Sequence, residues 1–198
     1  MMRHARDHRL SIEDYLAREN DGVVRHEYVA GEAYAMTGAS PRHNIIAGNV
    51  FARLRERARG GPCRVFISDM KLRVEAADAF YYPDVLVTCE PAGDDARFMT
   101  DPCALVEVLS PSTASIDRRE KLLAYRSLPS LGEYVIVDPR RRHVLVHRRE
   151  HGVWHALLLE NGDDQVVIGC LDTPITLDDI YEDVALPDVC EPWEEYVA

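Results

Sequence analysis

Two acidic residues stand inside segments of the chain that are otherwise apolar. Glu107 lies in Ala-Leu-Val-Glu-Val-Leu, and Asp84 lies in Tyr-Tyr-Pro-Asp-Val-Leu-Val. A carboxylate in an apolar strand is costly to desolvate unless it is paired, hydrogen-bonded or bound to a cation. Two such acids on neighbouring strands would repel each other, and a hard divalent cation relieves both problems. The pair therefore predicts a Mg²⁺ site, with Mn²⁺ as the expected substitute. The competing interpretation is that an arginine or backbone donors satisfy each acid separately.

Lys121 places a positive charge on the helix that we expect to follow these strands. Asp117, Lys121 and Tyr125 are four residues apart, so they share one helical face, where Asp117 and Tyr125 can orient the amine from the second shell of the site. An ordinary surface lysine is the alternative. Arg118, in the same basic cluster, and Tyr125 are further candidates for contacting a substrate.

Two more residues have the right chemistry and a less specific setting. His43 falls in the first turn of a predicted helix, whose amides favour anions, so it is a candidate contact to a DNA phosphate or simply a surface imidazole. Asp69 is a candidate for the second shell, although an acid at a bulge more often caps local amides. The histidines at every fourth position from 143 to 155 fall in a predicted hairpin, so we take their spacing as a coincidence.

The elements that position these residues follow from caps, turns and hydrophobic periodicity. We expect the N-terminal region to contain a helix from Ser11 to about Glu19, a hairpin of Val23–Tyr28 and Glu32–Met36 about Ala30-Gly31, and a helix from Pro41 to Gly60. We expect the central region to contain a strand from Val65 to Val74 with a bulge near Ser68, strands at Tyr82–Thr88 and Ala104–Leu109, a helix from Asp117 to about Leu128, and a strand at Tyr134–Val137. The C-terminal region should contain a hairpin of Val144–Arg148 and Val153–Leu159, then a short helix at Leu177–Val184.

Length and composition favour one α/β (α+β) domain that spans residues 1–198, with a core at about 11–186 and flexible termini. There is no leader-like segment and no apolar run of membrane-spanning length, so we expect a cytoplasmic protein without a membrane partner. The five cysteines have no paired Cys-x-x-Cys spacing, and we expect reduced thiols. The net charge of −11 argues against non-specific coating of nucleic acid but leaves room for a nuclease with local basic clusters.

Several motifs together carry a family resemblance over about residues 15–186. They are Pro83-Asp84, the run from Glu107 to Thr113, Asp117, Lys121, Tyr125, and the run from Glu133 to Pro139. With these motifs the chain resembles the Uma-type family of putative restriction endonucleases, within the PD-(D/E)XK nuclease superfamily. The resemblance implies a mixed central β-sheet flanked by helices, with an N-terminal helix and hairpin and a C-terminal β-hairpin.

The resemblance also implies a Mg²⁺-dependent endodeoxyribonuclease that acts on DNA, and a homodimer by analogy. Asp84, Glu107 and the carbonyl of Val108 would hold the ion, and Glu27 matches the family's early acid, as a ligand through water or at a second metal position. The superfamily lysine belongs two positions after the acid, where this chain has Leu109, so its role falls on Lys121. A catalytically silent binding or regulatory module, or a different metal-dependent hydrolase, are the alternatives.

Overall fold

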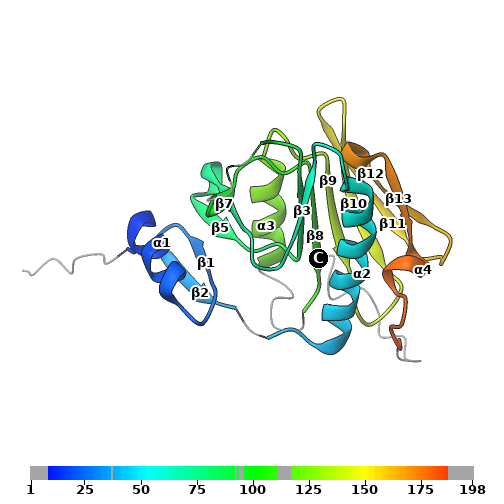
Figure 1. The fold of residues 1–198 in the computed structure, drawn as a ribbon, viewed down its shortest axis with the longest axis horizontal. Helices are drawn as coiled ribbons and strands as arrows, with labels where there is room; N and C mark the ends of the chain where they lie inside the picture. The colour runs from blue at the N-terminus through cyan, green and yellow to red at the C-terminus, as the bar shows by residue number, and fades with distance from the viewer. Residues whose placement is uncertain (1–8, 37, 92, 94–95, 111–116, 187–198) are drawn as a thin grey trace, which may run out of the picture.

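A six-stranded mixed sheet forms the centre of the protein (Figure 1) in a computed structural model that describes residues 9–36, 38–91, 93, 96–110 and 117–186. Only the backbone is described for residues 21 and 117–119. The sheet order is β11 (Val153–Leu159), β10 (Val144–Glu150), β9 (Glu133–Val137), β8 (Ala104–Val108), β6 (Val85–Thr88) and β3 (Arg64–Ile67). β8 and β9 run parallel, and the other neighbours are antiparallel.

Helices α2 (Pro41–Ala58) and α3 (Asp117–Arg126) cover opposite faces of this sheet. Alternate residues of β8 show the division, because Val106 packs in the cluster that contains the apolar face of α2, whereas Leu105 packs in the cluster that contains α3. A strand buried on both faces needs apolar residues at every position, which explains why Glu107 is conspicuous in the sequence. The predicted helical crossover between the two parallel strands, β8 and β9, is confirmed.

A second sheet, at the N-terminal side in Figure 1, carries the early hairpin. Its order is β2 (Glu32–Ala35), β1 (His26–Val29), β5 (Ala79–Tyr81), β4 (Lys71–Val74) and β7 (Phe98–Met99). Helix α1 (Ile12–Asp21) begins at the predicted cap Ser11 and packs Tyr15 against Tyr28 and Phe80. The hairpin turn has positive φ at both Ala30 (48°) and Gly31 (95°), which matches the right-handed twist of the two strands.

Two predicted strands differ from those of the structure at the points where the chain passes between the two sheets. The predicted strand Val65–Val74 is β3 in the central sheet and β4 in the other, because Ser68 takes a left-handed conformation (φ 56°) and turns the chain. The predicted strand Tyr82–Thr88 begins only at Val85, after Pro83, which cannot donate to a ladder. Asp84 therefore lies at the start of β6, where the sheets diverge, and not within a strand.

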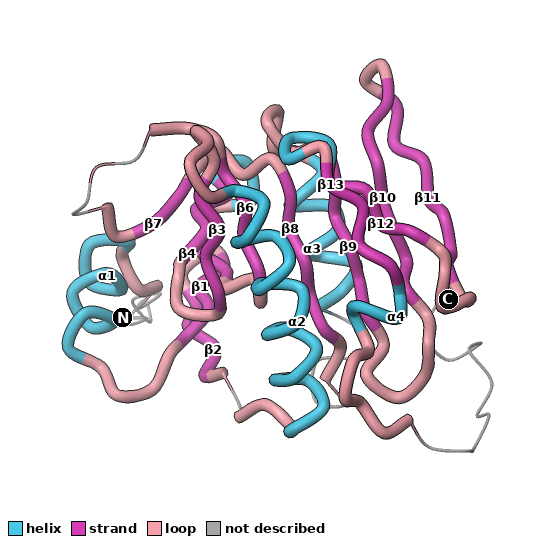
Figure 2. Tube along the Cα trace, turned by 45° about the vertical axis from the view of Figure 1, so that its right-hand side comes forward, coloured by secondary structure: helices cyan, strands magenta, loops and turns pink. Residues whose placement is uncertain are grey.

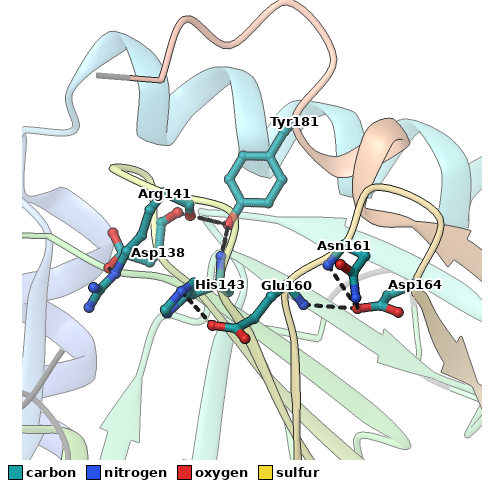
Figure 3. A network of polar contacts seen from close by, with 7 residues as sticks. All are labelled: Asp138, Arg141, His143, Glu160, Asn161, Asp164 and Tyr181. Atoms are coloured by element: carbon teal, nitrogen blue, oxygen red, sulfur yellow. Dashed lines mark hydrogen bonds and ion pairs between the residues drawn. The ribbon is translucent and has the colours of Figure 1, made fainter. Parts of the chain in front are cut away.

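The C-terminal segment adds a hairpin that the sequence does not predict. It consists of two short strands, β12 (Gln165–Ile168) and β13 (Thr173–Thr176), followed by α4 (Leu177–Ile180), which is shorter than predicted. Tyr181 fastens this segment to the central sheet (Figure 3): its hydroxyl oxygen lies 2.8 Å from the carbonyl oxygens of Asp138 and Arg141. The C-terminal elements are thus held against the end of β9.

The histidine spacing falls in the predicted hairpin of β10 and β11, which is confirmed. His143 pairs with Glu160 through Nε2 at 2.7 Å, and His147 stacks on Tyr134, while His151 lies in the turn. Since these three have different surroundings, the geometry agrees with a coincidental spacing. No helix among the described residues combines the length and the hydropathy needed to span a bilayer.

The cysteines differ from the expectation of separate reduced thiols. The structure joins Cys63 to Cys89 and Cys103 to Cys170 as disulfides, and Cys190 lies outside the described residues. The bonded residues are 26 and 67 positions apart. Pairing of β3 with β6 brings Cys63 to Cys89, and packing of the C-terminal segment against the core brings Cys170 to Cys103, so the spacing along the chain carries no sign of either pairing.

Candidate active site

A cavity of about 400 Å³ opens where the β1–β2 hairpin, the first turn of α2 and the ends of β6 and β8 meet. Figure 2 shows these elements around the lower end of the central sheet. The lining includes most of the residues predicted from the sequence, although they come from β1, α2, the segment before β6, β8 and α3. They are Glu27, His43, Asp84, Glu107, Val108 and Lys121.

Asp84 is held by the neighbouring strand and by α2. The register that pairs Val85 with Val106 puts Asp84 beside Glu107 at this end of the ladder. The backbone amide of Val108 donates to Asp84 Oδ2 at 2.7 Å, and His43 Nε2 lies 3.2 Å from the same oxygen. These contacts with a backbone amide and an imidazole offset part of the free-energy cost of burying the Asp84 carboxylate.

Glu107 is the most strongly perturbed acid of the site. Burial is the main reason that its pKa rises to about 7, and the negative charges of Asp84 and Glu27 add to the rise. Lys121 and the hydroxyl of Tyr125 act in the opposite direction: Lys121 Nζ lies 3.3 Å from Glu107 Oε1, and Tyr125 donates to that oxygen at 2.9 Å. Two donors therefore converge on one oxygen of this carboxylate.

Lys121 points from α3 into the site, with only 14% of its side chain exposed. Its Nζ lies 2.7 Å from Glu27 Oε1 and 3.3 Å from Glu107 Oε1, and 5.4 Å from the centre of the Tyr81 ring. Burial opposes its charge, but the two carboxylates outweigh that effect and raise the pKa of the ammonium above its usual value. The lysine is therefore positively charged and lies between the two glutamates.

Glu27 contributes more than an exposed hairpin residue would. In addition to Lys121, its Oε1 accepts a hydrogen bond of 3.3 Å from the backbone amide of Tyr82. β1 pairs with β2 on one side and with β5 on the other, and β5 ends at Tyr81, so Glu27 lies next to the segment that carries Asp84. In this arrangement Glu27 holds the amine of Lys121 in place.

His43 occupies the first turn of α2, as predicted, and its partner is an acid of the site. Burial lowers the pKa of the imidazole, but hydrogen bonds to Asp84 and to the backbone of Val108, with the charge of Glu107, give a net rise. The helix start at Ser40-Pro41 gives the position of His43, while nothing in the sequence indicates the contact with Asp84. Its predicted contact with a phosphate stays a prediction.

The remaining predicted residues have other surroundings. Tyr125 is fully buried, which leaves no surface for a substrate, and its hydroxyl supports Glu107 instead. Asp69 is 79% exposed and faces Arg25, with Oδ1 and Nε 3.6 Å apart, so the expected second-shell position is not found in the described contacts. The side chains of Asp117 and Arg118 lie outside the described residues.

A tyrosine cluster beneath the acids has no counterpart in the sequence-based prediction. The rings of Tyr81 and Tyr134 both meet Tyr125 nearly edge to face, with centroids 5.5 and 5.0 Å away. These rings form an apolar floor that fixes the hydroxyl of Tyr125 toward Glu107. The only signal for it is that Tyr81-Tyr82 directly precedes Pro83-Asp84.

Comparison with known proteins agrees with the fold and the motifs. Residues 12–180 match the Uma2 family, described as "Putative restriction endonuclease". Two uncharacterized proteins of Synechocystis sp. are similar: slr1290 is 34% identical over 179 residues, covering 89% of this chain and 94% of the relative, and sll1609 is 35% identical over 132 residues, covering 65% and 75%. The crystal structure of a putative nuclease belonging to DUF820 from Anabaena variabilis superimposes with a TM-score of 0.66 at 16% identity, covering 79% of this chain and 89% of that one. The predicted restriction-endonuclease-like fold is thus confirmed, and the chain belongs to the Uma2 family.

Proposed function

We propose that this protein is a metal-dependent endonuclease that hydrolyses phosphodiester bonds of DNA. The observation that carries the proposal is the convergence of three acids and one lysine, from separate elements, in a single cavity. The family to which the chain belongs supports a nuclease, and the first turn of α2, which lines the cavity, offers the amide environment that favours a phosphate.

The charges and donor atoms of the site fit a hard divalent cation. The site contains three carboxylates, from Glu27, Asp84 and Glu107. The basic groups that face them are the ammonium of Lys121 and the imidazole of His43. The pKa of Glu107 reaches about 7 because burial and the neighbouring acids disfavour its charge, so the site gains from a further cation. Carboxylate and carbonyl oxygens are the ligands that Mg²⁺ and Mn²⁺ prefer.

In this proposal Asp84, Glu107 and the carbonyl of Val108 hold the ion. When bound, such an ion polarises the scissile phosphate and lowers the pKa of a coordinated water. His43 keeps Asp84 oriented from α2, and Tyr125 does the same for Glu107 from α3. Both contacts fix carboxylate oxygens before a substrate arrives, which reduces the reorganisation needed in the transition state.

Lys121 has two roles in the proposed mechanism. Its ammonium positions the attacking water and offsets the negative charge that develops on the phosphate. Glu27 holds that ammonium at 2.7 Å, so it acts on the reaction through the lysine. A lysine on the helix after the strand thereby takes the position that Leu109 cannot fill within the strand.

Cleavage of supercoiled plasmid DNA tests the proposal. The purified full chain, with Mg²⁺ or Mn²⁺, should convert the plasmid to nicked or linear forms, and EDTA should stop the reaction. Asp84→Asn and Glu107→Gln should abolish cleavage, and Lys121→Met should lower the rate about 100-fold. Glu90→Gln is the matched control, because this exposed acid follows the opposite end of β6, and the variant should keep the full rate.

The pattern of results separates the nuclease from the alternatives. Equal cleavage by the wild type and by Asp84→Asn would assign the activity to a contaminant and overturn the proposal. A chain that cuts neither DNA nor RNA under any metal, yet binds nucleic acid, would be the catalytically silent module. Mapping of the product ends identifies a phosphodiesterase, since endonuclease cleavage leaves discrete phosphate-bearing ends.

A further inference from the structure

Four cysteines converge at the end of the central sheet that is opposite to the acids. β6 begins directly after Asp84 and ends directly before Cys89, while Cys103 comes directly before β8, the strand that carries Glu107. The antiparallel register of these strands puts the two cysteines at one end and the two acids at the other. β3 also pairs with β6 in antiparallel register, with Arg64 opposite Thr88, so Cys63 lies next to Cys89 at the same end of the sheet.

The fourth cysteine comes from the C-terminal hairpin. Cys170 belongs to the short turn between β12 and β13, and its carbonyl oxygen lies 3.6 Å from Cys63 Sγ. The cluster therefore joins three strand ends of the central sheet (β3, β6 and β8 in Figure 2) to an element that the sequence places far downstream. All four side chains belong to or pack against the same apolar core.

The sulfur atoms form one group and not two separate pairs. Cys89 Sγ lies 3.7 Å from Cys103 Sγ, which belongs to the other disulfide, and the sulfurs of Cys89, Cys103 and Cys170 all lie within 4.8 Å of one another. With zinc–sulfur bonds of about 2.3 Å, neighbouring sulfurs of a tetrahedral tetrathiolate are about 3.8 Å apart. Among the described residues this is the one group of three or more Cys, His, Asp or Glu side chains with ligand atoms this close.

We propose that, in its reduced form, this cluster is a structural zinc site made of Cys63, Cys89, Cys103 and Cys170. Each disulfide takes two electrons and two protons from a dithiol reductant, which is itself oxidised to a disulfide, and the four thiols then release four protons as they bind one Zn²⁺. Four protein ligands leave no open position, so the site is structural and fastens the C-terminal hairpin to the sheet. It is independent of the oxygen ligands at the other end of the strands.

Metal analysis of the full-length protein tests the proposal. Protein prepared with a dithiol reductant, loaded with Zn²⁺ and then desalted, should hold one zinc per chain by elemental analysis and by native mass spectrometry. Loading with Co²⁺ should give the thiolate-to-cobalt charge-transfer band and the visible absorption of a tetrahedral tetrathiolate. Thiol titration should find the four cysteines protected until a chelator removes the metal.

Four variants assign the metal to this cluster. Cys103→Ser and Cys170→Ser should lose the zinc and the cobalt spectrum, whereas Cys190→Ser should keep both. Glu107→Gln should also keep them, which excludes the acidic site as the source of the signal. Two outcomes of the wild-type measurement would overturn the proposal and do not depend on whether a variant folds: all five thiols reactive with no zinc bound, or two disulfides that the dithiol reductant leaves intact.

Discussion

Replacement of Lys121 by methionine removes the positive charge between two acids and keeps a side chain of similar length. In the wild type the ammonium lies 2.7 Å from Glu27 and 3.3 Å from Glu107, and at most 17% of any of the three side chains is exposed. Loss of one partner of a buried ion pair costs about 3–5 kcal/mol. Because the cavity admits water, we expect the lower limit, about 3 kcal/mol at pH 8 without metal. For a domain of this size that corresponds to a fall in Tm of about 6–12 °C.

The pH and metal dependence of this loss identify its cause. Without the ammonium, the pKa of Glu107 rises further above 7, so the variant should lose less stability at pH 5, where the carboxyl is protonated in both proteins. A divalent cation replaces part of the missing charge, so saturating Mn²⁺ should raise the Tm of Lys121→Met more than that of the wild type.

Thermal unfolding followed by circular dichroism, at pH 5 and pH 8 with EDTA or Mn²⁺, measures these effects. Arg53→Met is the control, since it removes a cation from a half-exposed pair with Asp179 and should change the Tm little, with no metal dependence. An unchanged Tm for Lys121→Met at pH 8, or a Mn²⁺ effect no larger than in the wild type, would show that the ammonium does not stabilise the two buried glutamates.

The contacts of Glu107 and of the β1–β2 turn can be tested in three more experiments. The pKa of Glu107 in the folded protein is about 7, above its ordinary 4.5, so a proton competes with the metal for this carboxylate. The Mn²⁺ affinity, measured by calorimetry, should therefore rise about tenfold per pH unit up to pH 7 and then level off. Glu107→Gln should remove this pH dependence. In the metal-free protein the stability from this group is present below pH 4.5 and is lost as the pH rises through 7. Tyr125→Phe deletes the 2.9 Å hydrogen bond to Glu107, so it should cost about 1.5 kcal/mol in denaturant unfolding and shift the levelling of Mn²⁺ affinity to higher pH. Gly31→Ala places a Cβ 2.7 Å from Arg9 Cβ at a residue with positive φ, so it should lower the stability by about 1 kcal/mol or more. It should also lower the cleavage rate, because the turn positions Glu27. An unchanged Tm would show that the turn relaxes freely.

The acids of the site could be predicted because desolvation leaves a local trace in the sequence. Glu107 interrupts a strand that is otherwise apolar on both faces, and Asp84 precedes such a strand. Lys121 and Tyr125 could be placed on one helical face from their spacing alone, and both reach Glu107. For these residues the local pattern and the global fold agree.

The parts that could not be predicted depend on contacts between distant segments. Ser68 divides one predicted strand between the two sheets, and Pro83 delays the start of another until Val85. A left-handed serine has no strong signal in the sequence. Helix α2 brings His43 to Asp84, and the strand register brings Cys63 to Cys89. The number of residues between the two members of each pair does not indicate that they are in contact. Such contacts follow from the packing of whole elements, which hydrophobic periodicity does not specify.

In the proposed site Asp84 and Glu107 bind one divalent cation, with Lys121 beside them. A crystal soaked in Mn²⁺, with the anomalous signal of the metal recorded, tests it most directly. We expect one strong anomalous peak about 2.1 Å from a carboxylate oxygen of each acid, with the ammonium of Lys121 next to it. The absence of a peak there at saturating Mn²⁺, with Lys121 still bridging Glu27 and Glu107 as the only cation, would contradict it.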